Sequence, residues 1–341
     1  MREMVTAEGR QPGETQVTQT ESAKEQTWGT SGKKQPTVAV LVPTYRPDKK
    51  FSRLLQMLQR QSYPVRQIII MNTDASLWNE GGYDGIDGFE VHHVTKEEFD
   101  HGGTRKRGMR YVRTDVCICM TQDAVPADED LVKNLVSALY QPLADPVAVA
   151  YARQLPQKGC RMVERCTRAF NYPEESCVKT AADLGRLGIK TYFCSNVCAA
   201  YRMEIYNRLD GFVERTIFNE DMLYAAQVID AGYGVAYAAE ARVFHSHNFT
   251  GMQQLRRNFD LAVSQAEHPE VFAGLTAEGE GIRLVKQTAR VLLRRGRWYL
   301  LPELVIKSGC KYIGFRLGKH YRLLPKALIR KLTSSPDYWR K

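Results

Sequence analysis

DVCICMTQDAVP, residues 115–126, is the stretch of sequence that decides the fold. Val116–Met120 is a nearly continuous apolar run between polar and turn-forming residues, a pattern typical of a buried strand in a parallel sheet. The strand would end at Thr121, Gln122 and Asp123, so it places one carboxylate at the carboxyl end of a central strand. Open α/β sheets bind their ligands at that end. Because Asp also starts turns and caps helices, Asp123 alone does not establish a site.

Two apolar runs that precede the central strand end in the same way. Residues 37–42 and 67–71 are rich in β-branched residues, and polar residues follow each run, at 43–45 and 72–74. A third strand is expected at Phe89–Val94, with helices from Pro47 to Gln61 and, after two glycines, at 104–112. Strands that alternate with helices at this spacing predict a parallel sheet with right-handed crossovers. The polar residues after the strands would then meet at one edge.

The alternation of strands and helices continues beyond the central strand. Strands are expected at 147–151, 196–201 and 235–238, and helices at 129–140, 203–209, 221–231 and 252–266. Between them, Lys158–Lys190 is charged and poorly periodic, and its length predicts a segment inserted over the site rather than part of the core. The pattern predicts an α/β fold of the nucleotide-binding type, although the sequence contains neither GxGxxG nor a P-loop.

Two more groups of polar residues accompany Asp123. Asn219, Glu220 and Asp221 open one of the expected helices, and His245 follows 24 residues after Asp221. A helix N-terminus stabilises an ionised carboxylate, so Asp221 is expected to be deprotonated and able to accept a proton. Helix capping alone would also explain the first three residues, and a hydrogen-bonded core histidine would explain His245.

These motifs, taken in order, resemble a family 2 glycosyltransferase of the GT-A fold. The strings HGGTR (101–105), TQDAVP (121–126), NEDMLYAAQVIDAGY (219–233) and FHSHNFT (244–250) are similar to those of bacterial rhamnosyltransferases in that family. The resemblance covers roughly residues 37–270. It implies an α/β, mostly parallel, Rossmann-like sheet flanked by helices, which this chain would extend with C-terminal helices.

The resemblance implies a nucleotide-sugar site at the ends of the first two strands and of the central strand. The residues expected to bind the nucleotide sugar are Pro43, Thr44, Tyr45, Asp74, Arg105, Gln122 and Asp123. Among them, Asp74 would hydrogen-bond the pyrimidine base, although turn formation would also explain an Asp there. Arg105 would contact the diphosphate, because a guanidinium fork suits phosphate oxygens.

The resemblance also implies a divalent metal, Mg²⁺ or Mn²⁺, that neutralises the leaving diphosphate as a Lewis acid. Asp123 occupies the last position of the family's DxD motif, and its carboxylate oxygens are suitable ligands for either ion. Thr121 replaces the first Asp of that motif, so the strictness of metal dependence stays open. His245 is the second expected ligand, and His247 competes with it, since alternate residues of a strand share a face.

For catalysis, the family's ED motif implies that Asp221 is the general base for the acceptor hydroxyl and that Glu220 orients the acceptor or a neighbouring loop. The implied reaction is an inverting transfer of L-rhamnose from dTDP-L-rhamnose onto a saccharide or lipid-linked saccharide. It would serve bacterial surface polysaccharide biosynthesis, whether of O-antigen, capsule or cell wall. Two alternatives stay open. One is another donor, for example UDP-galactofuranose; the other, favoured only by Thr121, is a catalytically silent scaffold that binds nucleotide sugar or membrane.

Charge is distributed unevenly along the chain and sets the expected domains. Residues 282–341 contain 16 Lys and Arg but only two acidic residues, so they carry a net charge of +14, and residues 1–281 carry −4. Residues 1–36 are polar, with few large apolar residues, and are expected to be a disordered leader. A catalytic domain at 37–281 and a basic, amphipathic helical segment at 282–341 complete the expected organisation.

The C-terminal segment combines helical apolar periodicity with aromatic and basic residues. Ile282, Val285, Ala289 and Leu292 recur at helical spacing, and Trp298 lies beyond them. This composition is typical of a helix that lies on an anionic membrane surface, and a helical lid packed on the catalytic domain is the alternative. Nucleic acid is not expected as a partner, because the sequence contains no recognised nucleic-acid module. Without a signal peptide or a membrane-spanning run, the chain is expected in the cytoplasm, peripheral on the inner face of the cell membrane.

Overall fold

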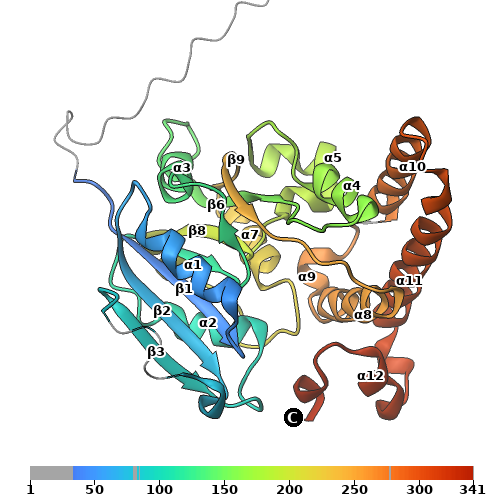
Figure 1. The fold of residues 1–341 in the computed structure, drawn as a ribbon, viewed down its shortest axis with the longest axis horizontal. Helices are drawn as coiled ribbons and strands as arrows, with labels where there is room; N and C mark the ends of the chain where they lie inside the picture. The colour runs from blue at the N-terminus through green and yellow to red at the C-terminus, as the bar shows by residue number, and fades with distance from the viewer. Residues whose placement is uncertain (1–33, 80–82, 84, 276–277, 341) are drawn as a thin grey trace, which may run out of the picture. The chain divides into compact units, whose positions relative to one another are not determined.

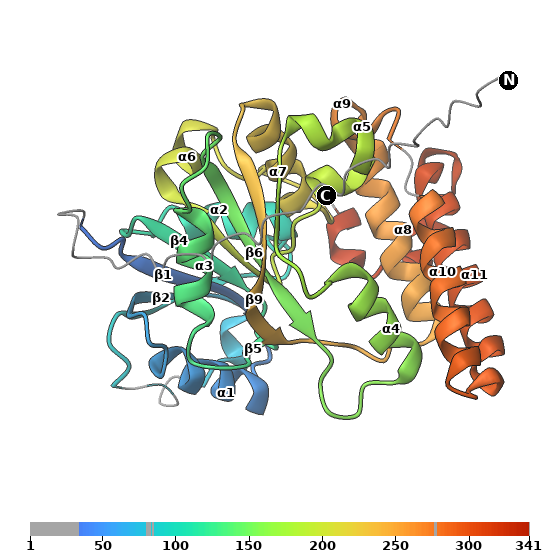
Figure 2. The same cartoon turned by 90° about the horizontal axis from the view of Figure 1, so that it is seen from above.

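The computed structural model of the chain describes residues 34–79, 83, 85–275 and 278–340. Residues from Pro36 onward form one compact unit in which helices cover both faces of a central sheet (Figures 1 and 2). The C-terminal helices belong to the same unit as the sheet. Nearly all of the leader predicted at 1–36 lies outside the described residues.

Nine strands of the described residues form a single mixed sheet in the order β3-β2-β1-β4-β8-β6-β9-β5, and β7 pairs with β9. Their bounds are β1 Val38–Tyr45, β2 Val65–Thr73, β3 Phe89–Val94, β4 Val116–Met120, β5 Val125–Pro126, β6 Val147–Leu155, β7 Cys177–Lys179, β8 Cys198–Arg202 and β9 Gly234–Phe244. The first four strands that the sequence predicts are parallel, and so are β6 and β9. β8 runs antiparallel to both β4 and β6, so the sheet is mostly rather than entirely parallel.

Strand ends converge at one edge of the sheet, as predicted. The bounds of β3 and β4 match the prediction, whereas β1 and β2 extend further than expected, to Tyr45 and Thr73. The polar residues that were expected to follow these strands therefore form their last pairs, for example Thr44 with Asn72. Leu41 of β1 pairs with Cys119 near the end of β4, and β1 continues beyond that point to Tyr45.

All six helices that the sequence predicts between residues 47 and 266 are present, with bounds shifted by a few residues. The described helices are α1 Lys49–Gln59, α2 His101–Met109, α3 Leu131–Leu139, α4 Met162–Asn171, α5 Leu184–Leu187, α6 Met203–Arg208, α7 Glu220–Asp230, α8 Gly251–Glu267, α9 Pro269–Phe272, α10 Glu278–Arg294, α11 Leu301–Lys319 and α12 Lys326–Leu332. α1 begins after Pro47, because Asp48 caps it by accepting a hydrogen bond from Lys50 N (2.9 Å).

The start of α2 differs from the prediction in a way that matters for the site. Gly102 and Gly103 lie inside the helix rather than before it, and Asp100 caps it by accepting a hydrogen bond from Gly103 N (2.7 Å). Both glycines pack directly against the carbonyl groups of Val213 and Glu214, so any side chain there would collide with backbone. The close approach brings α2 against the loop that leads into α7.

The core lies on both faces of the sheet, because alternate residues of a strand point to opposite sides. β4 is buried at every position. On one face, Leu41 and Cys119 belong to the same buried cluster as Met109 of α2 and Tyr224 of α7. α1 covers the other face (Figure 2). Burial on both faces explains why the central strand is a continuous apolar run.

Residues 158–190 are more regular than the sequence predicts. They contain α4, α5 and β7, and β7 extends the sheet by pairing with β9. Val163 of α4 packs against Leu292 of α10 and Leu304 of α11. The segment therefore joins the C-terminal helices to the sheet instead of forming an irregular insertion.

The C-terminal helices pack against α8. α11 lies along α8, and Gly314 and Gly318 bring the two helices close enough to contact the carbonyl groups of Leu255 and Phe259. α10 begins at Glu278, so the boundary predicted at residue 282 falls inside a helix. Among the described residues, no helix is long and apolar enough to cross a membrane.

Candidate functional site

The ends of β1 and β4 are joined by a side chain that the sequence assigns to the donor site. Gln122 Oε1 accepts a hydrogen bond from Tyr45 N (2.8 Å), and Gln122 Nε2 donates to Tyr45 O (3.1 Å). Beside them, the buried Thr44 hydroxyl donates to Asn72 Oδ1 (3.1 Å), and Pro43 precedes Thr44 in β1. Four of the seven residues predicted to bind the nucleotide sugar therefore lie at adjacent strand ends.

Asp74 follows β2 and is held by its own turn. Its Oδ1 accepts hydrogen bonds from the Ser76 amide (3.2 Å) and hydroxyl (2.5 Å), and its Oδ2 lies 2.9 Å from Lys96 Nζ. The hydrogen bond from Ser76 and the charge of Lys96 lower the pKa of Asp74, so the carboxylate is ionised at neutral pH. The turn explains these contacts by itself, and the base-binding role of Asp74 stays a prediction.

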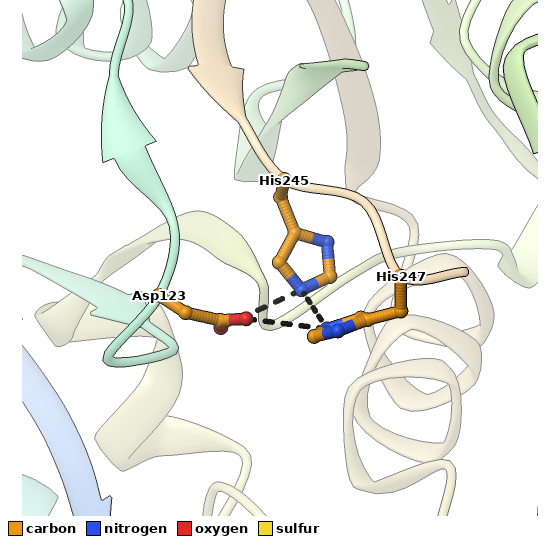
Figure 3. A group of neighbouring side chains, drawn as sticks. All are labelled: Asp123, His245 and His247. Carbon is orange, nitrogen blue, oxygen red and sulfur yellow. Dashed lines mark hydrogen bonds and ion pairs between the residues drawn. The ribbon is translucent and has the colours of Figure 1, made fainter. Parts of the chain in front are cut away.

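Asp123, His245 and His247 point their polar atoms toward one another (Figure 3). Asp123 Oδ1 lies 3.6 Å from His245 Nε2, and Asp123 Oδ2 lies 3.2 Å from His247 Nε2. The two Nε2 atoms are 3.1 Å apart, and the three ligand atoms lie within 4.8 Å of one another. One carboxylate oxygen and two imidazole nitrogens converging on one point are a suitable set for a divalent transition metal.

Strand pairing explains why these three side chains meet. Val125 of β5 pairs with Phe244 of β9, so Asp123, two residues before Val125, comes to lie beside His245. The sequence treats His247 as a competitor of His245 for the metal. In the structure both histidines belong to the same group, on the segment that follows the last residue of β9.

Hydrogen bonding and burial put His245 in the state that a metal ligand needs. Gln154 Oε1 accepts hydrogen bonds from Arg168 and from His245 Nδ1 (3.0 Å for the latter), which leaves the His245 Nε2 lone pair facing Asp123. Burial lowers the pKa of His245 to about 3, against the opposing charge of Asp123. Burial would raise the pKa of Asp123, but His247 and His245 outweigh it and hold that pKa below its usual value.

This supporting group lies outside the motifs that the sequence shows, and its residues are not predicted from them. Gln154 is in β6, beyond the strand end expected at residue 151, and α4 was not predicted. Arg168 Nε donates to Glu164 Oε1 (2.7 Å), and Gln154 Nε2 donates to Ser195 Oγ (3.0 Å). The sequence of β6, VAVAYARQL, has no apolar-polar alternation, so no local signal marks Gln154.

Glu220 and Asp221 lie in the first turn of α7, as predicted. Asn219 precedes them with φ +64°, a left-handed conformation that Asn tolerates better than most residues. Asp221 Oδ2 accepts a hydrogen bond from Asn196 N (2.8 Å), and Asp221 Oδ1 accepts one from Met222 N (2.8 Å). The side chain is half-buried.

The expected effect of the helix terminus on Asp221 is wrong in direction. Burial, and then the neighbouring charge of Glu220, raises the pKa of Asp221 to about 7, although the two backbone hydrogen bonds favour the ionised form. Desolvation outweighs the helix terminus because protein atoms surround the carboxyl group, although the residue as a whole is partly exposed. The result is a carboxyl group that titrates near neutral pH.

Arg105 lies between α2 and α7 rather than in open solvent. Its side chain is 4% exposed, and its Nη1 lies 3.1 Å from Glu220 Oε1 and donates to His101 O (3.1 Å). Asn196 Nδ2 donates to the same Glu220 oxygen (3.0 Å). The contact between Arg105 and the diphosphate stays a prediction. To make it, the guanidinium would have to bind the diphosphate and Glu220 together, or give up its ion pair with Glu220.

Arg257 is a second arginine near the site, and no sequence motif points to it. Its guanidinium carbon lies 5.2 Å from the ring centre of Phe218 and 5.0 Å from that of Phe249. Phe249 stacks on His247, with the ring centres 4.9 Å apart. The residue as a whole is exposed, although desolvation of its guanidinium lowers the pKa of Arg257, and within the part of the chain that the structure describes it forms no ion pair. Among the described residues it is therefore a cation that stacks on aromatic rings without an acidic partner, between the histidine pair and the loop that leads into α7.

Comparisons with known proteins agree on the family of the chain. The model of the family described as Glycosyl transferase family 2 matches residues 39–210. The O-antigen chain rhamnosyltransferases RfbN of Salmonella typhimurium and WbaN of Salmonella anatum are 36% and 34% identical over 306 and 312 residues, which are 89% of this chain and 96% of each relative. The mannosyltransferase PcManGT from Pyrobaculum calidifontis, solved with GDP-Man and Mn²⁺, is 15% identical with a TM-score of 0.50, over 90% of this chain and 86% of that one. The predicted GT-A fold is confirmed.

Proposed function

This chain belongs to glycosyltransferase family 2, and from that premise we propose that it transfers L-rhamnose from a nucleotide diphosphate onto a saccharide. We choose L-rhamnose because the chain is similar to two O-antigen chain rhamnosyltransferases over 96% of their length. By the same similarity, the acceptor is a lipid-linked saccharide in the synthesis of an O-antigen type of polysaccharide. dTDP-L-rhamnose is the proposed donor.

In the proposed reaction, one bond at the anomeric carbon replaces another. The acceptor hydroxyl gives its proton to Asp221, its oxygen bonds to the anomeric carbon, and the bond from that carbon to the diphosphate oxygen breaks. The electron pair leaves with the diphosphate. Attack from the face opposite the diphosphate inverts the configuration. A carboxyl group with a pKa of about 7 suits this role, because a base works best when its pKa lies near the working pH.

We assign Glu220 and Arg105 to positioning Asp221 and tuning its pKa. Arg105 pairs with Glu220 at 3.1 Å, and Glu220 is 5% exposed, so the negative charge of Glu220 is fixed beside Asp221. That charge is one cause of the raised pKa of Asp221. Asn196 donates a hydrogen bond to each carboxylate, from its backbone N–H to Asp221 and from its side chain to Glu220, and so fixes the position of one relative to the other. Glu220 thereby also sets the orientation of the loop that faces the acceptor.

We assign Asp123, His245 and His247 to a divalent metal. When bound, the ion supplies a Lewis acid that neutralises the charge of the leaving diphosphate. Two imidazole nitrogens favour Mn²⁺ over Mg²⁺, because Mg²⁺ prefers oxygen ligands and keeps several waters. His247 compensates for Thr121, which leaves one carboxylate in the motif where the family has two. The relative from Pyrobaculum calidifontis, solved with Mn²⁺, fits this assignment.

The donor would then lie across the ends of β1, β2 and β4. The side chains and backbone of Pro43–Tyr45, with Gln122, surround the nucleoside, and the ionised Asp74 can accept the ring N–H of thymine or uracil. Arg257 offers the diphosphate a cation that is not committed to an acidic side chain. We therefore propose Arg257, more than Arg105, as the arginine that contacts the diphosphate.

We further propose that α11 rests on an anionic membrane surface on the cytoplasmic side. Val305 and Ile306 are 65% and 63% exposed, and Tyr312 and Ile313 repeat them two turns later on the same face. The opposite face of α11 packs on α8, so the helix is both a packed element and an exposed apolar surface. The net charge of +14 on residues 282–341 provides the attraction to anionic lipid. Nucleic acid is not proposed as a partner.

A donor screen tests the proposed function. The full chain is incubated with dTDP-L-rhamnose, UDP-galactofuranose and other nucleotide sugars, each with Mn²⁺ or Mg²⁺, and release of the nucleotide diphosphate is measured. We expect turnover with dTDP-L-rhamnose, and more with Mn²⁺ than with Mg²⁺. Turnover with UDP-galactofuranose alone would replace the sugar but keep the mechanism. Binding without turnover of any donor, with and without saccharide acceptors, would favour the silent scaffold.

A further inference from the structure

After α12 the described part of the chain turns back toward the ends of the first strands of the sheet (Figure 1). A cavity of about 270 Å³ lies there, and its lining comes from segments far apart in the sequence. Tyr45 and Thr73 are at the ends of β1 and β2, and Lys96 and its neighbours follow β3. Ile217, in the loop before α7, and Ser334–Tyr338 complete the lining. The sequence analysis assigns residues 334–338 only to the basic C-terminal segment.

Residues Ser334–Tyr338 are called the terminal stretch. A buried carboxylate in α8 holds the start of it. Asp260 is 2% exposed, and it accepts hydrogen bonds from the Thr333 hydroxyl (2.6 Å) and from Ser334 N (2.7 Å). Thr333 Oγ1 in turn accepts a hydrogen bond from Ser335 N (2.9 Å). A buried carboxylate needs such partners, because an unpaired one would carry a large desolvation cost. The path of the chain after α12 is therefore fixed from inside the protein.

Tyr338 anchors the other end of the stretch. It is 9% exposed and packs in one cluster with Ile217 and Phe259. Arg215 stacks over the Tyr338 ring at 4.8 Å and donates a hydrogen bond to Tyr338 O (3.0 Å). Tyr338 OH also donates to Glu267 (3.3 Å). Because Arg215 and Ile217 lie in the loop that leads into α7, the terminal stretch also braces that loop.

We propose that Ser334–Tyr338 forms one wall of the subsite that takes the nucleoside of the donor. The inference rests on the proposed function, since the ligand is the nucleoside of a nucleotide diphosphate. The cavity lies just below the range of roughly 300–1,000 Å³ that ligand pockets span, so it suits part of a nucleotide sugar rather than all of it. Tyr45 and Phe99 offer aromatic surface, and Lys96 and the terminal serines offer polar groups for the base and the ribose.

This role separates the end of the chain from the proposed membrane contact. The exposed apolar residues lie on α11, whereas the terminal stretch is held to α8 and to the loop before α7. Arg340 pairs with Asp337 at 3.1 Å, so the two charges of the last described turn compensate each other. The terminal stretch should therefore affect nucleotide binding without affecting membrane binding.

The test compares dTDP with inorganic diphosphate, both titrated with Mn²⁺ into full-length protein. Tyr338→Ala removes the anchor, and Asp260→Asn weakens the hold on Thr333 and Ser334. Both variants should raise the Kd for dTDP by about tenfold or more, as truncation of a well-packed binding residue does. The Kd for inorganic diphosphate should change little, because that ligand has no nucleoside. Lys326→Gln, an exposed residue of α12 outside the cavity lining, is the matched control and should bind both as the unaltered protein does.

Hydrogen exchange on the unaltered protein gives a second readout that does not depend on how the variants fold. Peptides that cover residues 333–340 should become more protected when dTDP and Mn²⁺ bind, and should not when inorganic diphosphate and Mn²⁺ bind. Equal protection in the two cases, or an unchanged Kd for dTDP in Tyr338→Ala, would overturn the inference and leave the proposed function intact. An unaltered protein that binds no nucleotide diphosphate would overturn both.

Discussion

The raised pKa of Asp221 leads to a specific pH dependence of the reaction. Proton transfer to Asp221 requires the ionised carboxylate, whose pKa burial and Glu220 raise to about 7. At pH 7 about half of the molecules are then competent, and kcat/KM should fall about tenfold for each pH unit below 6. Above pH 8 the rate should be level. The assay is release of dTDP in the presence of acceptor, measured from pH 5 to pH 9 at constant Mn²⁺.

Two substitutions test whether Asp221 and Glu220 cause this loss of activity at low pH, the acid limb of the pH profile. Asp221→Asn keeps the shape of the side chain and removes the proton acceptor, so kcat should fall by roughly 10²- to 10⁴-fold, with the Kd for dTDP little changed. Glu220→Gln removes the neighbouring charge and should move the acid limb toward lower pH by on the order of 1 unit. Asp230→Asn, at the exposed far end of α7, is the matched control and should have the unaltered profile.

Stability provides an independent check on the same carboxyl group. Since the pKa of Asp221 is raised in the folded protein, its protonated form is favoured there, and this contribution to stability is lost as the pH rises through 7. Asp221→Asn should therefore melt no lower than the unaltered protein at pH 8. The reasoning would be refuted if Asp221→Asn kept near-normal turnover, or if its residual activity showed the same acid limb.

The other expected outcomes concern the C-terminal helices and the diphosphate. The double substitution Val305→Asp and Ile306→Asp should reduce co-sedimentation with anionic liposomes, most clearly at low salt, and should leave donor hydrolysis unchanged. Unchanged co-sedimentation would contradict the membrane proposal. Arg257→Ala should weaken dTDP binding by roughly ten- to 100-fold, the loss of one charge-assisted hydrogen bond. It should lower the melting temperature only slightly, because its stacking on Phe218 and Phe249 contributes on the order of 0.5–1 kcal/mol. Gly314→Ala should destabilise the protein by about 1–3 kcal/mol through collision with α8, whereas Gly309→Ala, which meets open space, should not.

The parts of the fold that sequence predicts well are those with an unambiguous local pattern. The bounds of β4 match the prediction because burial on both faces makes the whole strand apolar between polar ends. The antiparallel direction of β8 has no such local signature, since strand direction depends on connections made elsewhere in the chain. The start of α2 was missed because Gly102 and Gly103 read as helix-breaking residues, while in space they allow contact with residues 213 and 214.

The residues of the site also fall into two groups, those that sequence motifs identify and those whose role depends on packing. Asp123, His245 and Asp221 stand in motifs that order and spacing identify, and the structure brings the first two together with His247. Gln154 and Arg257 could not be predicted, because their relevance comes only from the packing of β6 and α8 around the histidine pair. The direction of the pKa shift of Asp221 likewise depends on burial, which a helix-terminus argument from sequence does not include.

The metal dependence of nucleotide binding tests most directly the claim that Asp123, His245 and His247 hold the donor diphosphate through a divalent ion. Calorimetry of dTDP binding is carried out with Mn²⁺ and with EDTA, in the unaltered protein, in Asp123→Ala and in His247→Ala. We expect Mn²⁺ to tighten binding by at least about tenfold in the unaltered protein, and we expect both substitutions to remove most of that gain. The same affinity for dTDP with Mn²⁺ and with EDTA, in all three proteins, would contradict the assignment.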